Sequence, residues 1–242
     1  MTEGRWDLHD PRWERAAVGT GIAFVVLALL AFLFAPDYPK ADESDVEVLR
    51  YFAENDTRVL WQAFMFGLAG ICFVWFFGTL SGLLRRAEPA TPGRLPAIVV
   101  AAAAAAAALH GIGVASFAAT ASSASEMVPV GRPLFHLGNM AWTLTNFPAI
   151  ALVAAVSLGV LRSGLLPDWV AWIGAAYIVL GLIDAFGRTA GDSTTFGPGG
   201  AFGILTFLVF LVWVLVTSLL LTQSMAPSAA SRREGAPPPP PE

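Results

Sequence analysis

The segment HLGNMAWTLTN, from His136 to Asn146, places several hydrogen-bonding side chains inside an otherwise apolar stretch. At about 100° per residue, four of these side chains fall on one face of an α-helix: His136, Asn139, Thr143 and Asn146. Such a face can bind a polar ligand, or it can hydrogen-bond to neighbouring helices. Unsatisfied polar groups in hydrocarbon cost several kcal/mol, so we expect this face to turn towards protein or water.

Two ionisable side chains on other apolar segments are candidates to join this polar face. A rise of about 1.5 Å per residue places His110 level with Thr143, and Asp184 level with Asn139. We therefore predict a ligand-binding cluster that includes His110 and Asp184. Two alternatives stay open: hydrogen bonding between helices explains the face, and an exposed ion pair with Arg188, four residues later, explains Asp184.

Motifs for enzymatic chemistry are absent from the sequence. It contains no glycine-rich phosphate loop, no Gly-x-Ser-x-Gly elbow and no His-Glu-x-x-His zinc motif. His110 and His136 differ in predicted depth by roughly 12 Å, which argues against a haem or metal ion shared between them. We expect no catalytic residue, cofactor or metal, and the lack of a basic, aromatic-rich surface argues against nucleic acid as a partner.

The composition indicates that membrane-spanning helices position these residues. Hydrophobic residues make up 56% of the 242-residue chain and charged residues 13%, against roughly 25% charged residues in soluble domains. Crossing a bilayer takes about 20 apolar residues. We predict an all-α, polytopic integral membrane protein that contacts the lipid bilayer through six helices: 16–35, 59–84, 95–120, 134–161, 169–187 and 201–222.

The distribution of positive charge predicts how the chain crosses the cell membrane. One side of the predicted bundle carries nine arginines, whereas the other carries Lys40 and four arginines. The positive-inside rule then places both termini in the cytoplasm. Residues 1–15 form a cytoplasmic or interfacial segment in this prediction, and the proline-rich residues 223–242 form a disordered cytoplasmic tail.

The first loop on the opposite, outer side predicts a short surface helix. Ser44 and Glu47 have the spacing of a capping box, and Val46, Leu49 and Phe52 follow at intervals of three. We expect this amphipathic helix to pack against the outer end of the bundle, with a lid over a cavity as the alternative.

Two Gly-x-x-x-Gly motifs, at 78–82 and 199–203, match the pattern of closely packed membrane helices. They allow a homo-oligomer without requiring one, and an unidentified membrane partner is the alternative.

Three stretches together resemble a bacterial family of six-span membrane proteins, the family of domain of unknown function 4386. These stretches are VLRYFAENDTRVLWQAF, FGTLSGLLRRAEP and LRSGLLPDWVAWIGAAYIVLGL. The resemblance covers roughly residues 15–222 and implies six spans, but no established activity and no site residues. From the residues, we favour a non-enzymatic accessory or sensory envelope component. The alternative is a small transporter with an outward-facing polar cavity between the third, fourth and fifth spans.

Overall fold

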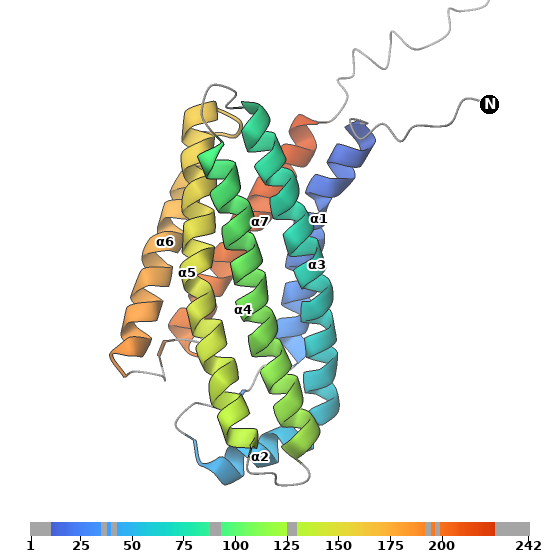
Figure 1. Cartoon of the computed structure of the whole chain (residues 1–242), viewed down its shortest axis with the longest axis vertical. Helices are drawn as coiled ribbons and strands as arrows, with labels where there is room; N and C mark the ends of the chain where they lie inside the picture. Colours follow the sequence, from blue (N-terminus) through green and yellow to red (C-terminus); the bar gives the residue numbers. More distant parts are fainter. Residues whose placement is uncertain are drawn as a thin grey trace, which may run out of the picture.

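The computed structural model describes residues 11–34, 38–39, 43–87, 93–124, 130–191, 195–196 and 199–225. Within these residues the fold is entirely helical, and six of its helices are long and apolar enough to cross a membrane (Figure 1). The predicted all-α bundle of six spans is confirmed. The long helices are α1 (Pro11–Phe34), α3 (Asp56–Ala87), α4 (Arg94–Ala124), α5 (Gly131–Ser163), α6 (Asp168–Thr189) and α7 (Ala201–Ser224).

The six long helices form a closed ring in which α1 packs on α3, and α3, α4, α5, α6 and α7 follow in sequence. Contacts between α7 and α1 complete the ring. At this seam Ser218 Oγ donates to the carbonyl oxygen of Val18 at 2.7 Å. A Cβ on Gly21 would lie 2.8 Å from the Cβ of Ser218, so the absence of a side chain on Gly21 allows the two helices to approach.

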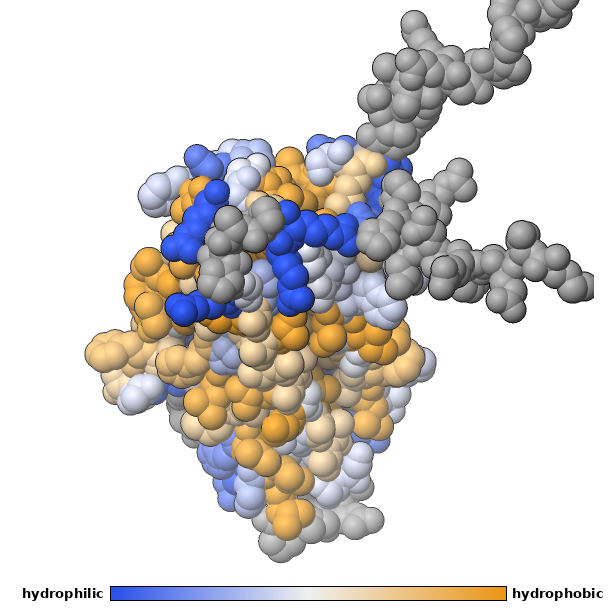
Figure 2. Space-filling model, turned by 45° about the horizontal axis from the view of Figure 1, so that its top comes forward, coloured by the Kyte–Doolittle hydropathy of each residue, from blue (hydrophilic) through white to orange (hydrophobic). Residues whose placement is uncertain are grey.

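The two ends of the ring differ. The short helix α2 (Asp45–Glu54) lies across one end, whereas α1 begins and α7 ends at the other (Figure 1). We call these the α2 end and the termini end. Exposed arginines including Arg85, Arg86 and Arg162 lie at the termini end. Figure 2 shows hydrophilic residues gathered at this end and a largely hydrophobic surface next to it, as expected for helices that face lipid.

The interior of the ring is tightly filled towards the termini end. Phe77, Leu80, Leu152 and Trp213 have no exposed surface. The indole Nε1 of Trp213 donates to the carbonyl oxygen of Val170 at 3.2 Å, so this large ring is also satisfied as a hydrogen-bond donor. These side chains close the interior on that side.

Helix α2 confirms the predicted capping box and corrects the predicted apolar face. Ser44 Oγ accepts from the backbone N–H of Glu47, and the Glu47 carboxylate accepts from the backbone N–H of Ser44. Val46, however, is 64% exposed, and the two buried side chains are Val48 and Phe52. A spacing of four, rather than three, aligns the docking residues, and they pack as predicted against the end of the bundle.

Two other predictions need correction or fall outside the described residues. Gly199 precedes α7 and has a positive φ of 82°. The 199–203 motif is therefore not a helix face, and its assignment as a close-packing motif was wrong. Most of the predicted N-terminal segment (1–10) and most of the predicted tail (226–242) lie outside the described residues.

Candidate functional site

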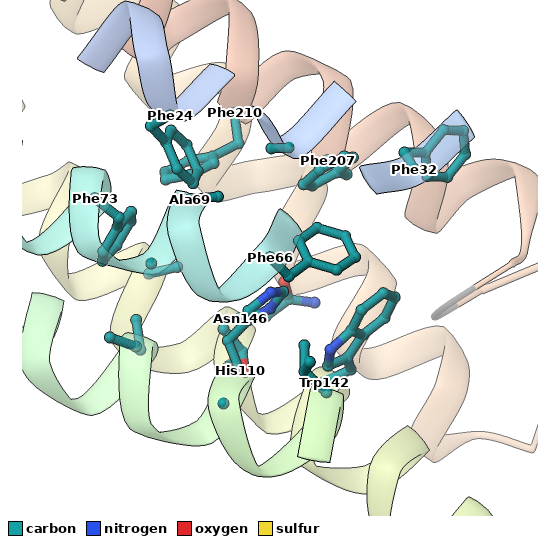
Figure 3. A pocket seen from close by; sticks show the side chains of 18 of the residues that line it. Phe24, Phe32, Phe66, Ala69, Phe73, His110, Trp142, Asn146, Phe207 and Phe210 are labelled. Atoms are coloured by element: carbon teal, nitrogen blue, oxygen red, sulfur yellow. The ribbon is translucent and has the colours of Figure 1, made fainter. Parts of the chain in front are cut away.

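A cavity of about 1070 Å³ occupies the ring from its middle towards the α2 end, and all six long helices contribute to its walls. Ligand pockets usually measure about 300–1,000 Å³, so this cavity is at the upper end of the range for small molecules. Small side chains facing inwards create the space, among them Ala28, Ala69 and Ala106. The larger lining side chains are mostly aromatic, including Phe24, Phe66, Phe73, Trp142, Phe207 and Phe210 (Figure 3).

One polar pair projects into this apolar interior. Asn146 Nδ2 on α5 donates to Asp184 Oδ2 on α6 at 3.0 Å, and both residues line the cavity. Asp184 is only 3% exposed. Its burial is compensated because the carboxylate accepts from Asn146 and interacts electrostatically with Arg188, one helical turn further along α6.

A second polar contact joins the same two helices nearer the α2 end. Arg188 Nη2 donates a long hydrogen bond to Asn139 Oδ1 at 3.4 Å. The side-chain amide of Asn139 in turn donates to the carbonyl oxygen of Phe135. Four polar side chains therefore form a continuous strip along the α5–α6 interface: Asn139, Arg188, Asp184 and Asn146.

His110 lies on the α4 wall of the cavity, beside Trp142 of α5. The two rings stack with their centroids 5.4 Å apart and an interplanar angle of 10°. Phe66 of α3 meets the edge of both rings, and Figure 3 shows these side chains grouped with Asn146. The indole Nε1 of Trp142 is buried without a hydrogen-bond partner. It packs against Gly113, where a Cβ would lie 2.8 Å from that nitrogen.

The structure divides the predicted polar face into two parts. Thr143 and Asn146 line the cavity, as does His110, whose predicted level beside Thr143 is confirmed. Asn139 is buried next to Arg188. His136 is exposed and does not join them, because its Nε2 accepts from Arg132 Nε at 2.8 Å near the α2 end.

The alternative prediction for Asp184, an exposed ion pair, was wrong because the residue is buried. The predicted depths assumed that α5 and α6 end at the same level. In fact α5 extends past α6 to reach α2 (Figure 1). Asp184 therefore lies level with Asn146, to which it is hydrogen-bonded, and not with Asn139 as predicted. The two positions differ by about two helical turns along α5.

Sequence reasoning also misjudged the character of the cavity and missed several of its residues. The predicted cavity was polar and lay between α4, α5 and α6, whereas the observed one is largely apolar and is lined by residues of all six long helices. Trp142, Tyr177 and Thr206 were not predicted to line it. Trp142 lies within the polar segment 136–146 and directly precedes Thr143. This position in the sequence could have indicated that Trp142 lines the cavity.

The cavity is continuous with the outer surface of the bundle. Its lining includes Ile71, Val74 and Trp75 of α3, which are 64%, 51% and 48% exposed. It also includes Gly111 of α4, where a Cβ would meet no atom within 4 Å. We call the exposed part of the lining on α3 and α4 the lateral mouth, and the buried Asp184 lines the same cavity.

Among the described residues, no group of three or more His, Cys, Asp or Glu side chains is arranged to hold a metal ion. Comparison with protein-family models, curated proteins and solved structures finds no match to this chain, and the family resemblance stays a prediction.

Proposed function

We propose that this multi-pass membrane protein binds a lipophilic small molecule inside its helix ring. The observation that carries the proposal is a cavity of about 1070 Å³ whose lining includes both the exposed Ile71 and the buried Asp184. Its volume is far larger than an ion requires. Its aromatic walls favour an apolar molecule, because apolar groups gain dispersion contacts with aromatic rings.

The packing supports binding rather than permeation. Phe77, Leu152 and Trp213 fill the ring between the cavity and the termini end. Transport, the alternative function, requires this tightly packed region to open. With both termini in the cytoplasm, as the arginines at the termini end favour, the cavity lies in the outer half of the membrane.

A chain of aromatic contacts favours a sensory role over simple storage. Trp142, in the cavity wall, packs against Phe117 with centroids 5.6 Å apart. Phe117 stacks on Phe52 of α2 at 6.1 Å. A molecule that moves Trp142 therefore disturbs the docking surface of α2, and α2 is the part of the described chain best placed to report occupancy outside the membrane.

Native mass spectrometry of the full-length protein tests the proposal. Purified gently from its own membranes, the protein should carry one lipophilic molecule at defined stoichiometry. Ala106→Phe fills the cavity and should abolish this binding, because Ala106 is buried and lines the cavity. Ala104→Phe is the matched control, since Ala104 is exposed on the same helix and does not line the cavity.

Equal binding by both folded variants would place the molecule elsewhere and overturn the proposal. A wild-type protein that binds no lipophilic molecule, either from its membranes or after addition of long-chain compounds, would overturn it as well.

A further inference from the structure

Resting on the proposed function, we infer the chemical class of the molecule: an apolar chain that ends in an uncharged hydrogen-bond donor, such as a hydroxyl, held by Asn146 and Asp184. The inference follows from the charge, the hydrogen-bonding character and the position of this polar pair.

The charge of the cavity wall disfavours an anionic end group. Among the described residues that line the cavity there is a carboxylate, Asp184, but no lysine or arginine. A carboxylate or phosphate on the ligand would lose its hydration in a medium of low dielectric constant, and no lysine or arginine of the described residues lines the cavity to pair with it. Anionic lipids are therefore poor candidates.

The surroundings of Asp184 also remove the need for a cationic end group. Arg188 lies one helical turn away and interacts electrostatically with the Asp184 carboxylate. An ion buried at a site where charges are already balanced loses its hydration without a full gain in attraction. An uncharged end group avoids this cost.

The polar pair presents acceptors to the cavity. Asn146 commits one of its two Nδ2 hydrogens to Asp184 Oδ2, and the pair contributes both the Asn146 amide oxygen and the carboxylate as acceptors. A carboxylate accepts up to about four hydrogen bonds, so Asp184 can hold a ligand's donor beside its protein partners. Hydrogen bonds to a charged acceptor are stronger than those between neutral groups.

The lining of the cavity offers an apolar chain aromatic partners away from the polar pair. Aromatic side chains of α1, α3 and α7 line the cavity, among them Phe24, Phe73 and Phe210 (Figure 3). Since the mouth opens on a lipid-facing surface, a long apolar chain can enter directly from the bilayer with its polar end leading.

Three long-chain compounds of equal carbon number test the inference on the full-length protein: a primary alcohol, the corresponding carboxylate and the alkane. Competition against the bound alcohol, followed by native mass spectrometry, should show the alcohol binding at least about tenfold more tightly than the carboxylate or the alkane. In Asp184→Asn the preference over the carboxylate should shrink to less than about threefold, since an amide can donate to an anion.

Asp168→Asn is the matched control, because Asp168 is exposed on the same helix and does not line the cavity. It should keep the wild-type preference. A second variant, Asn146→Leu, should reduce the advantage of the alcohol over the alkane, because the variant loses the amide oxygen and the hydrogen bond that orients Asp184. A carboxylate that binds as tightly as the alcohol, or a preference unchanged in both Asp184→Asn and Asn146→Leu, overturns the inference while leaving the proposed function intact. Failure of all three compounds to bind counts against the proposed function itself.

Discussion

Replacing Phe52 with alanine should release α2 from the end of the bundle. Phe52 has no exposed surface and packs against Tyr38, Phe117 and Phe135. Truncating a buried phenylalanine costs about 3–5 kcal/mol. Val48 is the other side chain of α2 that is buried, and a ten-residue helix is marginal without tertiary contacts. At about 1.4 kcal/mol per tenfold change, the loss corresponds to local opening that is at least about 100-fold more frequent.

Hydrogen–deuterium exchange of peptides covering residues 44–55 measures this opening directly, because the amides of α2 exchange when the helix undocks and unfolds. Val46→Ala is the control: this side chain is 64% exposed, and its truncation should leave exchange nearly unchanged. Peptides from α3 and α7 should keep their protection in both variants. Equal exchange in Phe52→Ala and wild type, or a larger effect of Val46→Ala, would refute the docking surface described above.

Three further perturbations follow from single contacts. Gly113→Ala should displace the Trp142 indole and lower stability by about 1–3 kcal/mol, seen as a lower thermal midpoint, whereas Gly111→Ala, whose Cβ would meet no atom within 4 Å, should cause no loss. Gly70→Leu should slow both association and dissociation of the cavity ligand in stopped-flow experiments, because Gly70 lines the cavity beside open space; Gly82→Leu, also beside open space but away from the cavity, should not. The hydrogen bonds from the Ser44 side chain and backbone lower the pKa of Glu47, so they stabilise α2 fully above pH 4.5 and less as the pH falls through the lowered pKa. Hydrogen–deuterium exchange of α2 should therefore rise below pH 4.5 in the wild type but not in Glu47→Gln. An identical pH dependence of the two proteins would contradict this.

Hydropathy was sufficient to predict the six spans, since no soluble arrangement can accommodate so many apolar segments of this length. Relative heights of residues on different helices were less predictable. His110 lies near Thr143, as predicted, since it stacks on the adjacent Trp142. Asp184 was placed about two turns away from Asn146, because α5 extends beyond α6 towards α2. The apolar cavity was unpredictable for a different reason. It arises from small side chains on several helices, such as Ala28, Ala69 and Ala106. The sequence of any one helix does not predict the volume that these side chains leave between the packed helices.

The seam between α1 and α7 has a consequence for biogenesis. Helices enter the membrane in the order of synthesis, so the ring keeps a gap beside α1 until α7, the last helix of the described chain, has been inserted. During that interval the cavity lacks the wall that Phe207 and Phe210 later provide. Formation of the bond from Ser218 to Val18 then completes the enclosure, and a ribosome-bound chain that ends before α7 lacks one wall of the chamber.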